Sequence, residues 1–158
     1  MNQFDLIIIG TGGGTKLRPA ANLGKKVAII EKEDFGGTCL NRGCIPSKMF
    51  IYPADVLASA QKLNKFSIQQ RDAKIDVSWK EMVNRVTAAV TKDAESIPVS
   101  YEKHPNITVY RGHAMFKANK VVEVNGETLT ADKILIAAGT RPSLPNIPGL
   151  EGTPYMTS

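Results

Sequence analysis

The chain has 158 residues, of which 42% are hydrophobic and 22% are charged, as expected for one soluble globular domain. Its net charge of +5 is spread along the sequence rather than gathered in one block, which argues against a nucleic-acid or membrane-binding patch. The apolar run 6–9 is too short to span a bilayer and lacks the flanks of a signal peptide, so we expect a cytoplasmic protein.

The first thirty residues predict a strand–turn–helix–strand unit. The apolar, β-branched run 4–9 predicts a buried parallel strand that ends at Gly10. The glycine-rich loop 10–15 (GTGGGT) comes next, followed by a segment of helical length up to Gly24 and a second strand at 26–30. This order of elements is typical of dinucleotide-binding folds.

The residues of that unit each have a physical reason to be there. Gly10 permits the tight turn after the strand, and Gly12 lets the backbone approach a pyrophosphate. The usual third glycine position is Thr15, and Gly14 stands just before it. Glu31 follows at the spacing of about 20 residues at which a carboxylate accepts hydrogen bonds from a ribose 2′-hydroxyl and would repel a 2′-phosphate. The pattern therefore argues against NADP at this site, and a purely structural glycine turn remains the alternative.

Pro19 falls inside the expected helix, where it would remove a hydrogen bond and kink the chain. Proline is tolerated in the first turn of a helix. We therefore predict a short helix that begins near Pro19, so that the loop 11–16 would hold the pyrophosphate.

The only two cysteines, Cys39 and Cys44, lie close together in the sequence. On one regular helix the axial rise alone would separate them by about 7.5 Å, whereas a disulfide needs Cα atoms no more than about 7 Å apart. The backbone must therefore leave the helix to form a disulfide, and Asn41 and Gly43 are expected to do so with positive φ angles. The pair is either a redox-active dithiol, the usual role of paired cysteines in the cytosol, or two free thiols. A zinc site would need more ligands than lie nearby, so we expect no metal.

The rest of the chain predicts helices and short strands. One helix is expected from Ser47 or the cysteine loop to about Leu63, and a second from Asp76 to about Tyr101 with a break at Pro98. The first helix is expected to bury an apolar face made of Met49, Ile51, Ala54, Val56, Leu57 and Ala60. Short strands are expected at 107–110, 114–117, 121–124 and 127–130, a hairpin turn at 125–126, a returning strand at 134–137, and an extended proline-rich exit with no further element from 142 onward.

Residues 36–48 (GGTCLNRGCIPSK) closely resemble the redox-disulfide motif of the class I pyridine nucleotide–disulfide oxidoreductases. This family includes dihydrolipoamide dehydrogenase, glutathione reductase, mercuric reductase and mycothione reductase. The loop 10–15 and the segment 134–142 (ILIAAGTRP) support the resemblance, with Ala138 standing where the family usually has threonine. The short stretch between residues 10 and 27 looks more like mycothione reductase than like dihydrolipoamide dehydrogenase.

The resemblance implies a fold and a domain organisation. The fold would be α/β: a Rossmann-like FAD-binding domain with a parallel sheet plus a small antiparallel β-meander. Residues 1–150 would form the first segment of that domain, including a redox-disulfide helix at 38–63. Residues 151–158 would begin the linker to an NAD(P)-binding domain that this sequence does not contain. One alternative is therefore a non-catalytic FAD-binding fragment.

The resemblance also implies roles for individual residues. Cys39 would be the thiol that exchanges with the substrate, Cys44 the thiolate beside the flavin, and Lys48 the cation near flavin N5. The backbone of Ala114 would meet the adenine. Together with Lys48, the expected cofactor contacts are Gly10, Gly12, Gly14, Glu31, Lys32, Gly37, Thr38, Ala114, Ala138 and Gly139.

By the same resemblance, the parent enzyme would pass electrons between NAD(P)H, FAD and a Cys39–Cys44 disulfide. We expect dihydrolipoamide dehydrogenase-like chemistry first, with a mycothione, glutathione or mercuric-type reductase as the alternative. The implied partners are a small-molecule disulfide or dithiol substrate or a lipoyl domain, and the parent would be a homodimer. No nucleic-acid or membrane partner is expected.

Overall fold

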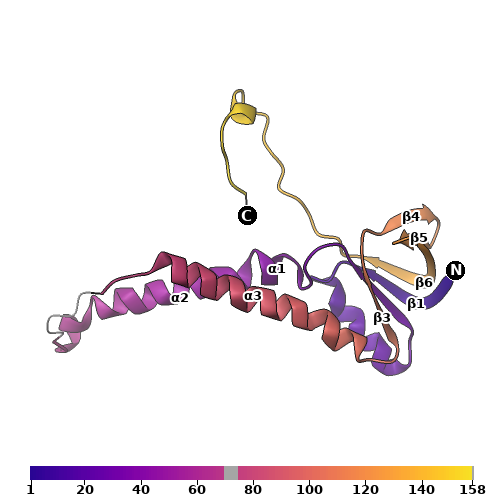
Figure 1. Cartoon of the computed structure of the whole chain (residues 1–158), viewed down its shortest axis with the longest axis horizontal. Helices are drawn as coiled ribbons and strands as arrows, with labels where there is room; N and C mark the ends of the chain where they lie inside the picture. The colour runs from indigo at the N-terminus through magenta and orange to yellow at the C-terminus, as the bar shows by residue number, and fades with distance from the viewer. Residues whose placement is uncertain (70–74, 158) are drawn as a thin grey trace.

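The computed structural model describes residues 1–69 and 75–157, and within them six strands form one mixed sheet (Figure 1). The strands are β1 (Asn2–Ile9), β2 (Val27–Glu31), β3 (Ile107–Arg111), β4 (Met115–Ala118), β5 (Val121–Val124) and β6 (Glu127–Ile136). The helices are α1 (Gly37–Asn41), α2 (Cys44–Ala60) and α3 (Trp79–Glu102), with 3₁₀ turns η1 (Gly14–Leu23), η2 (Leu63–Phe66) and η3 (Leu150–Gly152). The sheet order is β3-β2-β1-β6-β5-β4, parallel from β3 to β6 and antiparallel from β6 to β4. The prediction of a Rossmann-like α/β fold with a parallel sheet and an antiparallel meander is confirmed.

Both faces of the central strands are covered. On one face Ile7 packs with the meander residue Val122, and on the other Ile8 packs with Ala21 of η1. Residues 27–30 of β2 are at most 1% exposed. Strands buried on both faces need continuous apolar runs rather than alternation, which explains the sequence of β1 and β2.

Strand β6 covers, as one continuous strand, a region where the sequence predicts two separate strands. The sequence predicts separate strands at 127–130 and 134–137, but a single strand pairs with β5 through its first part and with β1 along most of its length. The exposed Asp132 and Lys133 interrupt the apolar pattern without interrupting the backbone ladder. The prediction of two strands is therefore wrong, because periodicity reports side chains and not backbone pairing.

The helix after the glycine loop is a 3₁₀ helix that already begins at Gly14 and contains Pro19. The predicted short helix starting near Pro19 is therefore wrong. Gly14 and Ala21 are buried in η1, and η1 contacts β1 and β2. Because Gly14 and Ala21 pack on the sheet, helix η1 begins at Gly14 rather than near Pro19.

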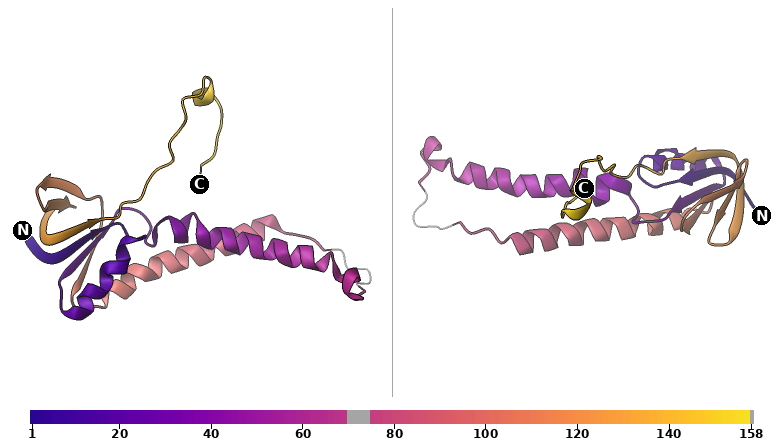
Figure 2. Two further views of the ribbon diagram at one scale, coloured as in Figure 1. Left: turned by 180° about the vertical axis from the view of Figure 1, so that it is seen from behind. Right: turned by 90° about the horizontal axis from the view of Figure 1, so that it is seen from above.

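Helices α2 and α3 run side by side away from the sheet (Figure 2). The predicted break at Pro98 is wrong, because α3 continues to Glu102. Pro98 is buried, as are Val86 and Ala94 of the same helix. Proline has no backbone N–H, so α3 loses one hydrogen bond at Pro98, and the burial of this residue offsets that loss.

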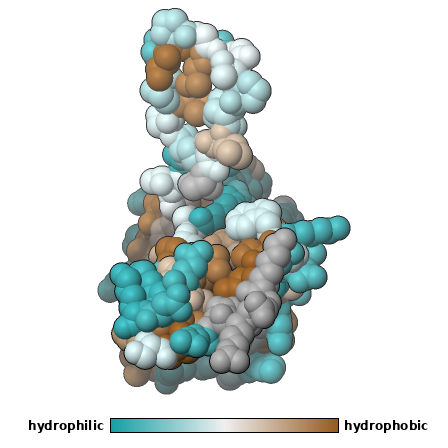
Figure 3. Space-filling view, turned by 90° about the vertical axis from the view of Figure 1, so that its left-hand side faces the viewer, coloured by the Kyte–Doolittle hydropathy of each residue, from teal (hydrophilic) through white to brown (hydrophobic). Residues whose placement is uncertain are grey.

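The predicted buried face of α2 is also wrong, since no residue of α2 is buried. Ile51 and Val56 are 57% and 51% exposed. Among the described elements α2 lies mainly against α1 and α3, and Phe50 stacks on Trp79 with ring centroids 5.3 Å apart. Figure 3 looks along this pair from its far end, where apolar side chains lie exposed among polar ones and Phe66 is 72% exposed.

Beyond β6 the chain leaves the sheet as an extended segment that projects from the rest of the molecule (Figure 1). The prediction of an exit without further elements is wrong at η3, which forms one short turn. The expected linker 151–158 lies in this segment, and its last residue is outside the described residues. None of the helices described is both long and apolar enough to cross a membrane.

Candidate functional site

The glycine-rich loop leaves β1 where the parallel strands β1, β2 and β6 end side by side. The backbone N–H of Gly10 donates to Ile30 O at 2.8 Å, and the N–H of Ala137 donates to Ile9 O at 2.8 Å. Gly10 has φ +98°, and a Cβ there would run into the carbonyl of Ala137, with the carbonyl carbon 2.7 Å away. Only glycine therefore fits this turn, as the sequence predicts for Gly10.

Gly14, rather than residue 15, is the third glycine of the loop that packs closely against neighbouring residues. A Cβ on Gly14 would lie 2.8 Å from Ile8 Cγ2 and 2.9 Å from Ala137 Cβ. Thr15 instead turns its hydroxyl back to the loop and donates to Thr11 O at 3.2 Å. The glycine that permits close helix–strand packing is thus displaced by one position from the usual spacing.

The cysteine-bearing segment touches the glycine loop directly. Gly37 has φ +65°, and a Cβ there would lie 2.6 Å from Gly12 Cα. Gly36, with φ +102°, makes the preceding turn. These glycines bring the start of α1 against Gly12, so the predicted nucleotide loop and the predicted redox segment form one site.

Thr11 links the two parts, a contact that its place in the predicted pyrophosphate loop 11–16 does not reveal. Its side chain is almost fully buried, with 2% of the residue exposed. Its hydroxyl donates to Glu31 Oε2 at 2.7 Å and accepts from the N–H of Gly36 at 3.0 Å. The residue type between two glycines is not restricted by the glycine pattern, so only the three-dimensional contacts reveal this bridge.

Glu31 is held entirely by the chain itself. Oε2 accepts from the N–H and the hydroxyl of Thr11, and Oε1 accepts from the N–H groups of Lys32 and Glu33 at 2.9 and 3.1 Å. A carboxylate offers about four acceptor sites. A ribose hydroxyl would therefore have to displace one of these donors.

The two cysteines lie on different helices, as the geometry of a disulfide requires. Cys39 is in α1, and Cys44 is the first residue of α2. The break between them uses Arg42 at φ −140° and Gly43 at φ −135°, so the predicted positive φ angles at Asn41 and Gly43 are wrong. Gly43 is needed for a different reason: a Cβ there would lie 2.9 Å from the carbonyl oxygen of Thr38.

Both thiols are free and exposed. A hydrogen bond with Cys44 is the main reason that the pKa of Cys39 lies above its ordinary value, while the Lys48 charge acts weakly in the opposite direction. The two thiols are therefore close neighbours. Cys44 lies at a helix N-terminus, where the helix dipole stabilises negative charge.

Most of the other predicted contact residues are exposed. Thr38, in α1 next to Cys39, is exposed. Ala138 and Gly139 are exposed after β6, and a Cβ on Gly10 would lie 3.2 Å from Ala138 Cα. Ala114 follows β3 and packs at the edge of the core, while Lys48 is exposed on α2.

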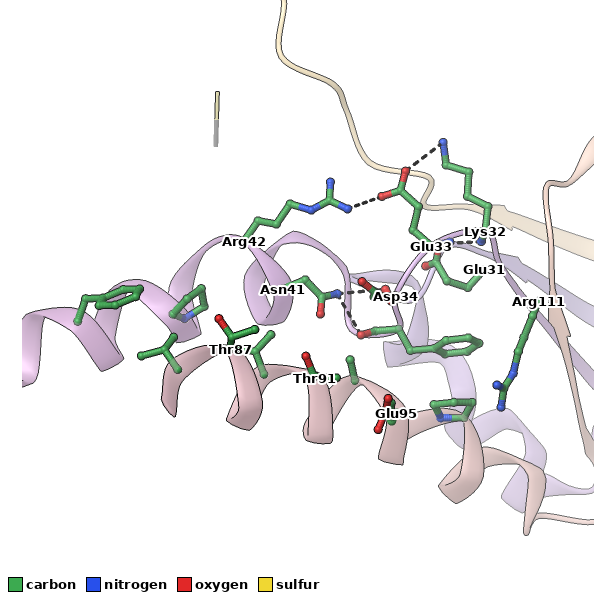
Figure 4. Close-up of a pocket in the computed structure, with 17 residues that line it drawn as sticks. Glu31, Lys32, Glu33, Asp34, Asn41, Arg42, Thr87, Thr91, Glu95 and Arg111 are labelled. Carbon is green, nitrogen blue, oxygen red and sulfur yellow. Dashed lines mark hydrogen bonds and ion pairs between the residues drawn. The ribbon is translucent and has the colours of Figure 1, made fainter. Parts of the chain in front are cut away.

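A pocket of about 540 Å³ opens beside the site, between the loop after β2 and one face of α3 (Figure 4). Glu31, Lys32, Arg42 and Arg111 line it together with apolar residues of α3 such as Val90. At its rim Glu33 lies 2.6 Å from Arg42 Nη2 and 3.6 Å from Lys32 Nζ. Neither cysteine lines this pocket, and no cluster of three or more metal-binding side chains occurs among the described residues.

The Glu33–Arg42 pair predicts a pH-dependent contribution to stability. The hydrogen bond and charge of Arg42 lower the pKa of Glu33. A depressed carboxyl pKa stabilises the fold above the unfolded value, ordinarily about 4.3 for glutamate, and this contribution is lost as pH falls through the folded pKa. We expect R42A to be slightly less stable than the unsubstituted chain at neutral pH, with the difference fading on acidification. Urea midpoints at several pH values measure this, and a difference that does not depend on pH would exclude the pair as its cause.

Comparison with known proteins places these features in one family. The family model described as "Pyridine nucleotide-disulphide oxidoreductase" matches residues 4–158. Mycothione reductase from Mycobacterium tuberculosis (strain ATCC 25618 / H37Rv) is 39% identical over 165 aligned residues, covering 100% of this chain and 35% of the relative. Dihydrolipoyl dehydrogenase from Acholeplasma laidlawii is 34% identical, covering 94% of this chain and 44% of the relative.

A solved structure shows the same fold. The HOCl-induced flavoprotein disulfide reductase RclA from Escherichia coli superposes with a TM-score of 0.76 at 29% identity, over 95% of this chain and 31% of that one. The chain thus spans about a third of the length of its mycothione reductase relative. The match to the family model over nearly the whole chain shows that it belongs to the pyridine nucleotide–disulfide oxidoreductase family.

Proposed function

We propose that this chain forms the first FAD-binding segment of a disulfide oxidoreductase whose Cys39 and Cys44 cycle between dithiol and disulfide. The observation that carries the proposal is the backbone contact between Gly12 and Gly37. It places the cysteine-bearing helix directly on the loop that would bind the dinucleotide. Redox exchange between the two groups requires such proximity.

The residues around the loop fit FAD. Within the described residues, the backbone N–H groups of Gly12 and Gly13 donate no hydrogen bond, and a Cβ on Gly13 would meet nothing within 4 Å. Free N–H groups such as these, with open space at Gly13, suit pyrophosphate oxygens. Glu31 would accept from the adenosine ribose after losing one of its present donors. Further contacts are proposed for Gly10, Gly14, Lys32, Gly37, Thr38, Lys48, Ala114, Ala138 and Gly139.

The two cysteines are proposed to have different roles, one beside the flavin and one toward the substrate. Bound FAD would supply a two-electron carrier between NAD(P)H and the cysteine pair. Cys44, at the N-terminus of α2, would hold negative charge beside it, and the exposed Cys39 would form and break the mixed disulfide with substrate. Lys48, one turn along α2, would balance that charge. The overall exchange is NAD(P)H + H⁺ + disulfide giving NAD(P)⁺ + dithiol, and it runs in either direction.

The whole protein is proposed to add an NAD(P)-binding domain after residues 1–150, with 151–158 as the start of the linker, and to act as a cytoplasmic homodimer. The resemblance of residues 36–48 to the redox motif of the family favours dihydrolipoamide or a lipoyl domain as substrate. The 39% identity to mycothione reductase, against 34% to dihydrolipoyl dehydrogenase, supports a low-molecular-weight disulfide as the alternative. A non-catalytic FAD-binding segment is the second alternative.

Flavin binding tests the proposal. The purified chain is mixed with excess FAD, desalted, and examined for retained visible absorbance, with FMN as a matched control. We expect FAD to be retained and FMN to be lost, because the glycine loop and Glu31 recognise the adenosine diphosphate half that FMN lacks. A folded, colourless protein, or equal retention of the two flavins, would contradict the proposed site.

A further inference from the structure

The side chain of Asn41 fastens the loop that leads into the cysteine-bearing helix (Figure 4). Its Nδ2 donates to the carbonyl oxygens of Asp34, Phe35 and Gly37, each at 3.1 Å. An amide nitrogen has two N–H groups, so at least one of them is shared between two acceptors. One side chain thus satisfies three carbonyls of the segment 34–37.

The same segment is held from its other side by the nucleotide loop. The N–H of Gly36 donates to the Thr11 hydroxyl at 3.0 Å, and the backbone of Gly37 lies against Gly12. Asn41 is the last residue of α1, so its amide ties the end of that helix back to its beginning. The segment 34–37 is therefore clamped between the nucleotide loop and Asn41.

Helix α1 needs such a clamp, because it has only five residues. An isolated helix of that length is not stable in water. Cys39 lies on α1 and Cys44 on α2, and the chain between them leaves helical geometry at Arg42 and Gly43. The position of Cys39 relative to Cys44 therefore depends on how firmly α1 is anchored.

We propose that Asn41 is a positioning residue for the cysteine pair: its amide fixes α1 so that the two sulfur atoms stay within reach of each other. The effective concentration of one thiol at the other is thereby raised, which favours the disulfide over the dithiol. This inference rests on the proposed function only in treating the pair as redox-active. It concerns residues of this chain alone and needs no bound flavin.

The test is the thiol–disulfide equilibrium of the purified chain in glutathione buffers. In this exchange the Cys39–Cys44 dithiol loses two electrons and two protons, while one oxidised glutathione is cleaved to two reduced glutathione molecules. The fraction of disulfide is read by quenching with acid and alkylating the remaining thiols. We expect N41A to lower the equilibrium constant for disulfide formation about tenfold, because without the amide clamp disulfide closure must also order α1, at a cost of about one net hydrogen bond.

Two further variants complete the design. N41D keeps the shape of the side chain but has no N–H to donate, so it should shift the equilibrium in the same direction. Asn106 is the matched control: its Nδ2 donates to Ala21 O at 3.1 Å, away from the clamped segment, and N106A should leave the equilibrium constant unchanged.

The outcomes are distinct. An unchanged equilibrium constant in folded N41A and N41D would overturn the proposal, since a merely structural asparagine alters the unfolding midpoint but not the disulfide equilibrium of the folded chain. Loss of the fold in both variants would also overturn it, because Asn41 would then be required for folding as a whole. Failure of the chain to bind FAD would contradict the proposed function and leave this equilibrium measurable.

Discussion

Replacing Cys44 with serine is expected to abolish electron exchange between the cysteine pair and bound FAD while leaving the fold intact. A serine hydroxyl forms no disulfide and is not oxidised by flavin, so Cys39 has no partner. Cys44 is exposed, and so no core packing is lost. The measurement is anaerobic addition of dihydrolipoamide to the FAD-loaded protein. The oxidised flavin absorbance should disappear in the unsubstituted protein and persist in C44S, apart from the slow direct reaction in solution.

A serine on the same helix provides the control for that experiment. S59A removes only a hydroxyl that donates to Asp55 O, far along α2 from the cysteines, and should be reduced at the unsubstituted rate. C39S is expected to lose the exchange with substrate as well. Reduction of the flavin in C44S at the rate seen with S59A would refute the assignment of Cys44.

Replacing Gly10 with alanine is expected to destabilise the chain by about 3 kcal/mol or more and to abolish FAD binding. Two effects add: a positive φ costs an alanine about 1–3 kcal/mol, and overpacking costs about as much again. The methyl group would run into the Ala137 carbonyl, which belongs to the backbone at the end of β6 and cannot rotate away. Urea unfolding measures the loss of stability, and the desalting experiment measures the loss of FAD.

Gly13 provides the matched control within the same loop. Its φ is −72°, and a Cβ there would meet nothing within 4 Å. G13A is therefore expected to change the free energy of unfolding by less than about 0.5 kcal/mol, as for a surface substitution. Equal stability of G10A and G13A would show that the turn at Gly10 is not the constraint described here.

Elements governed by short-range patterns are predicted well from the sequence. The strand at 121–124 has the predicted bounds, and the strands β1 and β2 begin and end within two residues of prediction. Continuous apolar runs and an Asn-Gly turn favour their structures through a few neighbouring residues. The predicted bounds of these elements therefore depend little on the packing of the rest of the chain.

Elements that depend on distant partners are predicted poorly. Pro98 does not break α3, because the buried side of that helix holds it in place. The apolar face of α2 is not buried, because periodicity shows that a face is apolar and not that a partner covers it. The 3₁₀ form of η1 likewise follows from packing against β1 and β2.

The sequence by itself determined which residues are candidates for the chemistry of this protein: two closely spaced cysteines, a glycine-rich loop, and Glu31 at the spacing after that loop that is typical of ribose-binding carboxylates. Residue types and short spacings encode those features. Only the tertiary structure decided that Gly12 meets Gly37, that Thr11 bridges Glu31 to Gly36, and that Asn41 clamps the segment before Cys39. Such contacts depend on where separate loops end in space once the sheet has formed, and no periodicity in the sequence records that.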